Sequence, residues 1–113
     1  MSRFKVSKEI INKFKEYSTS NLSDALDRLG IYGGCHGIKP VISGRKMVGS
    51  AFTLRYIPCG LKKGTVGDYI DDVEPGEIVV IDNAGRTWST VWGDPLTLTA
   101  KQRRVAGTMI DGV

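Results

Sequence analysis

The sequence predicts a single α/β domain, in which two short N-terminal helices precede a core of strands and helices. Apolar residues recur at helical spacing in residues 7–29. Residues 77–113 give the order strand, loop, helix, strand, which is typical of a βαβ unit. The length of 113 residues and the hydrophobic content of 41% are enough for a core that needs no disulfide or metal. We therefore expect one domain over residues 1–113, with its α/β core in residues 46–113.

Two amphipathic helices are expected near the N-terminus, within residues 7–29. The apolar face of the first is formed by Ile10, Ile11, Phe14 and Tyr17. The same spacing returns in the second, in Leu22, Ala25, Leu26 and Leu29. Ser18–Asn21 supplies capping residues before the second helix, and Gly30 stands where helices commonly end.

The middle of the chain is mostly loop around one expected strand. Residues 31–44 contain four glycines and a proline, so they favour a loop. In residues 46–58 apolar and polar residues partly alternate, which indicates a strand, and Gly49 marks a bulge or a close backbone approach. A turn-rich loop follows at residues 60–67, and residues 66–73 favour one or two helical turns.

The last third of the chain carries the βαβ pattern. After a turn at Pro75–Gly76, residues 77–82 form a short apolar run typical of a strand buried on both faces. A loop leads to a helix over Asp94–Arg104, whose basic residues lie in the last turn, where the helix dipole favours them. Residues 106–113 then predict a second buried strand.

Charge and composition argue against several classes of protein. The net charge is +4, but the 16 basic residues are spread along the chain, so no nucleic-acid partner is expected. The N-terminus has no apolar signal segment, and the longest aliphatic run is Ile78–Ile81. We therefore expect neither export nor contact with a membrane, and a cytoplasmic location. Cys35 and Cys59 lack zinc-ligand spacing, and we expect two free, buried thiols.

Asp94 is the main candidate for chemistry, and two interpretations of it stay open. Aspartate is a preferred N-cap residue and Pro95 suits the first helical position, so a structural role explains both. A helix start also presents free N–H groups and a partial positive charge, which hold a carboxylate or phosphate. Asp94 would then orient or deprotonate a water, or support a metal. Because Pro95 lacks an N–H, the donors would come from Leu96 and Thr97.

Other acidic residues have structural explanations that we favour. One cluster consists of Asp68, Asp71, Asp72 and Glu74. Its oxygens suit Mg²⁺, but its spacing does not match a calcium loop, and a solvated helix face is the favoured explanation. Asp82 follows a buried strand, where it either caps the loop toward Gly85 or approaches the site; we favour the cap.

His36 and the glycine-rich loop give weaker signals. His36 is the only histidine, and its surroundings are more typical of a loop or core residue than of a catalyst. Its neighbour Cys35 does not indicate a nucleophilic dyad, because side chains adjacent in sequence rarely converge. The loop GLKKGTVG resembles a phosphate loop in its glycines and lysines alone, since the P-loop spacing is missing.

Four motifs, in a fixed order, are similar to those of one known family. They are Ser20–Gly30, Gly49–Leu54, Pro75–Asp82, and Trp92–Asp94 together with Val105–Gly107 and Ile110–Gly112. On these motifs the chain resembles the RraA-like family, which includes 4-hydroxy-4-methyl-2-oxoglutarate aldolases, regulators of ribonuclease activity and proteins labelled demethylmenaquinone methyltransferases. The resemblance implies a swivelling β/β/α sandwich, similar to phosphohistidine domains, that assembles as a homotrimer or hexamer.

The resemblance also implies a site that this sequence contains in part. The family's aldolases have an aspartate, then twenty residues, then Arg-Asp. Asp94 matches the first aspartate, and 19 residues follow it here. The substrate-binding arginine and the metal-binding aspartate would therefore fall just beyond Val113, and the sandwich is expected to be incomplete at its C-terminus.

By this resemblance the expected function is a lyase that depends on Mg²⁺ or Mn²⁺ and cleaves short 2-oxo dicarboxylic acids to pyruvate. The reaction would be 4-hydroxy-4-methyl-2-oxoglutarate cleavage, oxaloacetate decarboxylation, or both. Asp94 would activate a water, and Gly93, Pro95 and Leu96 would hold the substrate carboxylate. Two alternatives stay open: a non-catalytic, ribonuclease-regulator-like module that binds a protein partner, and an inactive truncated remnant. No glycine-rich nucleotide motif follows a first strand, so a methyltransferase is not expected.

Overall fold

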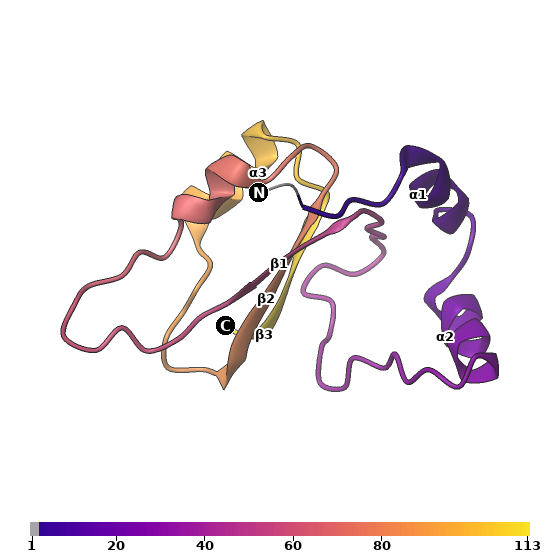
Figure 1. Ribbon diagram of the computed structural model, residues 1–113, viewed down its shortest axis with the longest axis horizontal. Coiled ribbons are helices and arrows are strands. Elements are labelled where there is room, and N and C mark those ends of the chain that lie inside the picture. The colour runs from indigo at the N-terminus through magenta and orange to yellow at the C-terminus, as the bar shows by residue number, and fades with distance from the viewer. Residues whose placement is uncertain (1–2) are drawn as a thin grey trace.

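A computed structural model describes residues 3–113, which form three strands, three α-helices and one 3₁₀ helix. In chain order the elements are α1 (Lys8–Phe14), α2 (Thr19–Arg28), β1 (Ala51–Arg55), the 3₁₀ helix η1 (Asp68–Asp72), β2 (Ile78–Arg86), α3 (Asp94–Gln102) and β3 (Gly107–Gly112) (Figure 1). Each lies where the sequence predicts an element of its type, although β1 is shorter than the predicted strand. The predicted domain also includes Met1 and Ser2, which lie outside the described residues.

All three strands of the sheet are parallel, in the order β1-β2-β3. β2, α3 and β3 follow one another as the predicted βαβ unit. The register aligns Leu54 of β1 with Ile81 of β2, and Ile81 with Ile110 of β3. Because aligned residues of neighbouring strands point to the same face, these side chains share the face that α3 and η1 cover. The predicted α/β class is confirmed.

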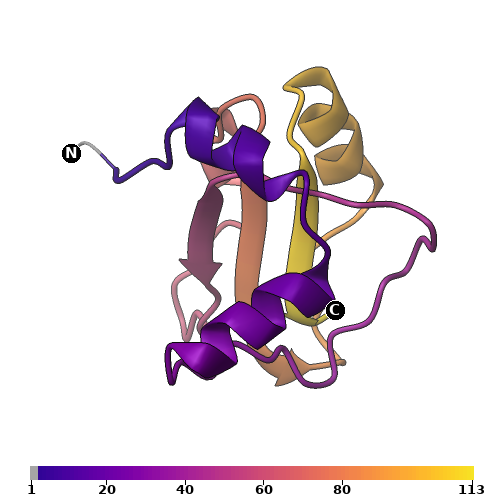
Figure 2. The ribbon, with the colours of Figure 1, turned by 90° about the vertical axis from the view of Figure 1, so that its right-hand side faces the viewer.

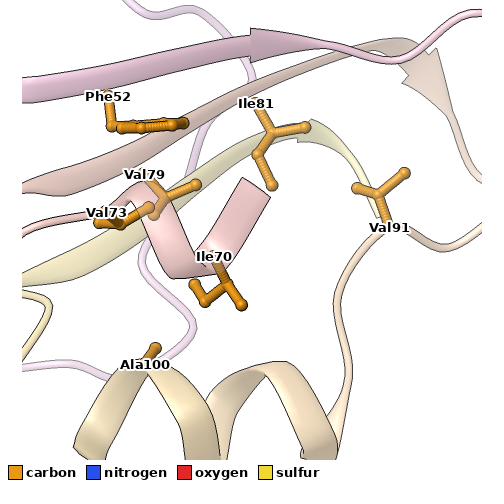
Figure 3. Close-up of a cluster of buried hydrophobic side chains, with 7 residues drawn as sticks. All are labelled: Phe52, Ile70, Val73, Val79, Ile81, Val91 and Ala100. Atoms are coloured by element: carbon orange, nitrogen blue, oxygen red, sulfur yellow. The ribbon is translucent and has the colours of Figure 1, made fainter. Parts of the chain in front are cut away.

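The hydrophobic core lies between the sheet and the layer formed by η1 and α3 (Figure 3). Its buried side chains are Phe52, Ile70, Val73, Val79, Ile81, Val91 and Ala100. Val79 and Ile81 reach the same face of β2 because side chains alternate along a strand. The β2–α3–β3 unit, with β1 and η1, therefore makes up the packed part of the described chain.

The two N-terminal helices lie on the opposite side of the sheet from α3 (Figures 1 and 2). Local caps start both of them: Ser7 Oγ accepts from the amide of Ile10, and Ser18 and Asn21 form a capping box. Neither helix contains a buried residue, and Ile10 and Phe14 are 46% and 43% exposed. Packing on the sheet therefore contributes little to either helix. No helix within residues 3–113 is long and apolar enough to cross a membrane.

The outer face of the sheet, opposite the core, is less buried than predicted. β2 is predicted to be buried on both faces, but its outward residues Ile78 and Val80 are half-buried. β3 is predicted to be a buried strand, and it contains no buried residue. The physical reason is that β3 is an edge strand of the described sheet and that α1 and α2 bury none of their side chains.

Two local predictions have opposite outcomes. A Cβ atom on Gly49 would lie 2.1 Å from the carbonyl oxygen of Gly76, so the predicted close backbone approach is confirmed. Cys35 and Cys59 are free thiols, but both are exposed, so the prediction that they are buried is wrong. Both cysteines lie in loops outside the core, where an apolar side chain finds no partners to bury it.

Glu77 is a buried carboxylate that holds the N-terminal residues against the core. It is 4% exposed, and Arg3 Nη1 and Nη2 donate to its two oxygens at 2.8 and 3.2 Å. The amide of Glu74 donates to Oε2 at 2.8 Å. The Arg3 guanidinium also lies 4.4 Å from the centroid of the Phe52 ring. Donors on both oxygens compensate for the burial of this charge.

Acid is expected to weaken the folded state through Glu77. Burial opposes ionisation of this group, but the hydrogen bonds from Arg3 and from the Glu74 amide outweigh it, so the pKa of Glu77 is lowered from its usual 4.5. The carboxyl group therefore ionises more easily in the folded than in the unfolded chain. Its stabilisation is complete above about pH 4.5 and is lost as the pH falls through the lower folded-state pKa.

Urea unfolding between about pH 3 and pH 6 measures this loss, which should be smaller in Glu77→Gln than in the wild type. Glu16→Gln is the matched control, because Glu16 is exposed. Its stability should follow the wild-type pH profile. A Glu77→Gln profile as steep as that of the wild type would assign the acid sensitivity to other carboxylates.

Candidate functional site

Asp94 is the first residue of α3 and carries an exposed carboxylate. Gly93 is the N-cap residue; its backbone is extended, and no side chain caps the helix. The predicted N-cap role of Asp94 is therefore wrong, and Pro95 is the second helical residue instead of the first. Within residues 3–113 no hydrogen bond or ion pair holds the Asp94 side chain, which leaves its carboxylate free for a ligand.

Three residues around Asp94 fix the start of α3. The amide and the hydroxyl of Thr97 each donate to the carbonyl of Gly93 at 2.9 Å. The indole N–H of Trp92 donates to Thr97 Oγ1 at 2.8 Å. Trp92 also packs against the core, so this chain of hydrogen bonds joins the exposed helix start to the buried layer.

The loop before α3 is tied to the ends of the strands. The amide of Val91 donates to the carbonyl of Val113 at 2.9 Å, and the amide of Val113 donates to the carbonyl of Arg86 at 3.1 Å. Val91 is itself buried in the core. Val91, which is three residues before Asp94, is thus fixed beside the ends of β2 and β3.

Asn83 and Arg86 support this loop, and sequence reasoning missed both. Asn83 is 1% exposed, and its Nδ2 donates to the carbonyls of Ser89 and Val113 at 2.9 and 3.3 Å. Arg86 Nη1 donates to Asn83 Oδ1 at 3.2 Å and to the carbonyl of Tyr56 at 3.3 Å. The one available signal was a polar residue directly after a buried strand, and it does not distinguish a buried amide from an ordinary loop residue.

The start of the nine-residue helix α3 can bind an anion. The amides of Asp94 and Leu96 have no acceptor within the helix, because it would lie four residues earlier, and Pro95 has no N–H. The Leu96 side chain turns inward, since a Cβ atom on Gly67 would lie 2.9 Å from Leu96 Cδ2. The predicted residues Gly93, Asp94, Pro95 and Leu96 therefore lie together at this helix start, where Leu96 offers its amide and not its side chain.

The described residues do not fit a metal ion by themselves. No group of three or more His, Cys, Asp or Glu side chains within residues 3–113 could hold one. A hard cation such as Mg²⁺ takes about six oxygen ligands, and Asp94 supplies at most two. In the acidic cluster, Asp68, Asp71, Asp72 and Glu74 are exposed on and beside η1, as expected for a solvated helix face.

Asp82 has the capping role toward Gly85 that the favoured interpretation predicted, but the turn it caps is an irregularity within β2, between Asp82 and Arg86. Its Oδ1 accepts from the amide of Ala84 at 2.9 Å, and its Oδ2 accepts from Arg55 Nε at 2.8 Å. The Ala84 amide, followed by Arg55, lowers the pKa of Asp82, so the group is ionised at neutral pH. Ala84 has a φ of +52°, in the left-handed region, and the Asp82 cap supports this turn.

Two cavities lie beside the sheet, and residues 93–96 line neither of them. One, of about 460 Å³, opens on the outer face between the loop that carries His36 and the ends of β2 and β3. His36 is an exposed loop residue, stacked on Tyr32 with 5.9 Å between ring centroids. The other, of about 500 Å³, lies under the loop between β1 and η1.

Comparison with known proteins gives one family match and two named relatives. Residues 19–113 match the RraA-like family, described as Aldolase/RraA. Protein DlpA of Legionella pneumophila is 44% identical over 99 residues, which are 84% of this chain and 16% of DlpA. A Halalkalibacterium halodurans protein named "Putative 4-hydroxy-4-methyl-2-oxoglutarate aldolase" is 30% identical over 104 residues, 92% of this chain and 48% of that protein. The chain spans about half the length of this second relative and a smaller part of the first.

Solved structures share the fold. An uncharacterized protein from Pseudomonas syringae pv. tomato has a TM-score of 0.86 and 38% identity, over 99% of this chain and 51% of that one. Streptomyces coelicolor RraAS2, described as an unusual member of the RNase ES inhibitor RraA protein family, has a TM-score of 0.85 and 25% identity, over 94% of this chain and 55% of its own. The fold predicted from the family resemblance is therefore confirmed.

Proposed function

This chain belongs to the RraA-like family, and we propose that it supplies part of the active site of a divalent-metal-dependent lyase that cleaves short 2-oxo dicarboxylic acids to pyruvate. The observation that carries the proposal is the free, exposed carboxylate of Asp94 beside unsatisfied amides at the start of α3. The 30% identity to a protein named as such an aldolase supports the choice of substrate class. Assembly as a homotrimer or hexamer is part of the same proposal.

Substrate binding in this proposal relies on the start of α3. The amides of Asp94 and Leu96 donate to a carboxylate of the 2-oxo acid, and the positive end of the helix dipole favours its charge. Gly93 leaves room for this approach, because nothing lies within 4 Å of where its Cβ would be. The hydrogen bonds of Thr97 to Gly93 keep these donors in place before the substrate arrives.

The reaction needs a group that moves a proton, and in this proposal the free carboxylate of Asp94 orients a water for this step. In the retro-aldol cleavage of 4-hydroxy-4-methyl-2-oxoglutarate, the 4-hydroxyl group loses its proton and the bond between C3 and C4 breaks. The electron pair of this bond forms the enolate of pyruvate, and the departing half is a second pyruvate. The enolate then takes up a proton at C3. Oxaloacetate has no 4-hydroxyl group to deprotonate: its C4 carboxylate leaves as CO₂, and the electron pair of the C3–C4 bond forms the same enolate, which takes up a proton at C3.

The proposed Mg²⁺ or Mn²⁺ would, when bound, draw electron density from the 2-oxo group. Residues 3–113 do not supply its ligand set, so the proposal assigns that set to groups outside the described residues. The contribution of this chain is the carboxylate of Asp94 and the amides at the start of α3.

Removal of divalent metal is expected to lower pyruvate release at least roughly 100-fold. The test uses the complete protein, with all the sequence that its gene encodes around residues 1–113, and follows pyruvate release from both substrates before and after EDTA treatment. Added Mg²⁺ or Mn²⁺ should restore the rate. A blank without protein corrects for spontaneous decarboxylation of oxaloacetate. Activity that survives EDTA would contradict the metal, and no pyruvate release from either substrate would contradict the lyase.

A protein-binding role is the second candidate function. Two observations favour it: the 25% identity to RraAS2, and the apolar side chains that α1 leaves exposed, such as Ile10 and Phe14. Such exposed apolar groups on one helix fit a protein partner, of which a ribonuclease is the expected kind. Inhibition of a ribonuclease by the complete protein, lost in Ile10→Ser/Phe14→Ser and kept in Asp94→Asn, would support this role over the lyase.

A further inference from the structure

The loop between β1 and η1 covers a cavity that the proposed lyase site does not use. The loop bows out from the sheet (Figure 1), and the cavity beneath it has a volume of about 500 Å³. The end of β1, the loop itself and Tyr69 of η1 line it, and residues 93–96 do not. Cavities of this size accommodate a small organic molecule.

The walls of this cavity carry positive charge without a carboxylate. Lys62 and Lys63 of the glycine- and lysine-rich loop line it together with Arg55, and no Asp or Glu does. Arg55 is already paired with Asp82, which lies outside the cavity. Within residues 3–113 neither lysine forms an ion pair. Two ammonium groups are therefore available to an anion.

Tyr69 adds a hydrogen-bond donor that has no partner. Its hydroxyl oxygen is buried and unpaired among the described residues, although a buried hydroxyl group normally has a partner. The neighbouring Tyr56 hydroxyl donates to the carbonyl of Val66. Its oxygen lies close enough to the Tyr69 hydroxyl to raise the pKa of Tyr69, but distance and angle together leave the Tyr69 hydroxyl without a hydrogen bond. Burial, followed by the neighbouring Tyr56, raises the pKa of Tyr69, so the phenol stays protonated and is a donor at neutral pH.

The chemistry of these walls selects a class of ligand. The ammonium groups and the phenol all donate hydrogen bonds, so they require a group rich in acceptor atoms. Ile57, Pro58 and Val66 make the rest of the lining largely apolar, which favours a carbon body over a bare inorganic ion. A carboxylate or a phosphate ester on a small apolar body has both properties.

We propose that this cavity binds a small organic anion, whose carboxylate or phosphate group contacts Lys62, Lys63 and the Tyr69 hydroxyl and whose apolar body lies against Ile57 and Val66. The site is separate from Asp94 and needs no metal. The glycines and lysines of this loop were already noted in the sequence as similar to those of a phosphate loop. In the structure both lysines line the cavity. The unpaired Tyr69 hydroxyl gains an acceptor when the ligand is bound.

Isothermal titration calorimetry in metal-free buffer tests the site. Benzoate and phenyl phosphate are the probes, benzamide is the neutral control, and inorganic phosphate is the control without an apolar body. Both organic anions should bind more tightly than either control. The probe with the higher affinity shows whether the site prefers a carboxylate or a phosphate ester. Probe binding that needs no metal and depends on Lys62 and Lys63 separates this site from the proposed lyase site, which neither lysine lines.

Two substitutions locate the binding. Lys62→Ala/Lys63→Ala should weaken binding of the probes at least about fivefold through the loss of two ion pairs. Tyr69→Phe should weaken it about tenfold, since it removes one hydrogen bond to a charged group. The Tyr69→Phe protein should also melt at the wild-type temperature or above, because the substitution removes an unpaired buried hydroxyl.

The control variant Lys8→Ala/Lys39→Ala removes the same charge from exposed positions far from the cavity and should bind like the wild type. An equal loss in both lysine variants would show general attraction of anions and would overturn the proposal. So would the absence of binding by both probes, or wild-type affinity in Lys62→Ala/Lys63→Ala. If Tyr69→Phe does not fold, the lysine variant alone decides.

Discussion

Replacing Asp94 with asparagine is expected to lower pyruvate release by the complete protein roughly 100- to 10,000-fold. Asparagine preserves the size of the side chain and the start of α3, but it cannot accept a proton or orient a water through a charged oxygen. The amides that hold the substrate carboxylate remain, so kcat should fall while KM changes by less than about threefold. Steady-state kinetics with both substrates measures the two constants.

The fold should tolerate this substitution. The Asp94 carboxylate is exposed and forms no hydrogen bond or ion pair within the described chain, so the melting temperature should stay close to that of the wild type. Asp24→Asn, at an exposed position of α2, is the matched control and should keep full activity. Unchanged turnover in Asp94→Asn would remove Asp94 from the mechanism, and a rise in KM alone would reduce its role to binding.

The position of Asp94 shows how a one-residue shift changes the chemistry. The sequence Gly-Asp-Pro allows either Gly93 or Asp94 to be the N-cap residue. With Asp94 as N-cap, its carboxylate would accept a hydrogen bond from its own helix. The structure places Gly93 there, and the carboxylate is free. The sequence predicts a helix start at this place. Which of the two residues is the N-cap depends on how the preceding loop is anchored, and this choice decides whether the carboxylate caps the helix or is free.

The features that could be predicted from the sequence are local. The strand–helix–strand order from β2 to β3 follows from apolar runs and from the Asp-Pro helix start, all of which lie within a few residues of one another. Pairings between distant residues have no such signal. Arg3 donates to Glu77, 74 residues away, and Asn83 donates to the carbonyl of Val113, 30 residues away. These contacts hold the N-terminal segment and the loop before α3, so the support of the candidate site could not be predicted from the sequence.

Burial could not be predicted from apolar runs for the same reason. Residues 78–81 are continuously apolar, and such a run is typical of a strand covered on both faces. Burial also depends on what other elements place on each face. In the structure η1 and α3 cover one face, while α1 and α2 stand on the other side without burying a side chain (Figure 2).

Replacing Ile81 with alanine is expected to lower the free energy of unfolding by about 3 kcal/mol. Ile81 is 2% exposed in the central strand, and its side chain lies in the cluster between the sheet and the layer of η1 and α3 (Figure 3). The substitution removes buried methyl and methylene groups and leaves a cavity that the surrounding strands cannot fill. Urea unfolding followed by circular dichroism measures the change.

Ile78→Ala is the matched control, because it makes the same chemical change in the same strand on the half-buried outer face. This substitution should lower the free energy of unfolding by about 1 kcal/mol, since folding buries less apolar surface at this position. The comparison of the two variants tests whether only one face of the sheet, the face covered by η1 and α3, is tightly packed. Equal costs at the two positions would mean that the outer face packs as tightly as the core. The loop that carries Asp94 would then depend on both layers, and not on the core side alone.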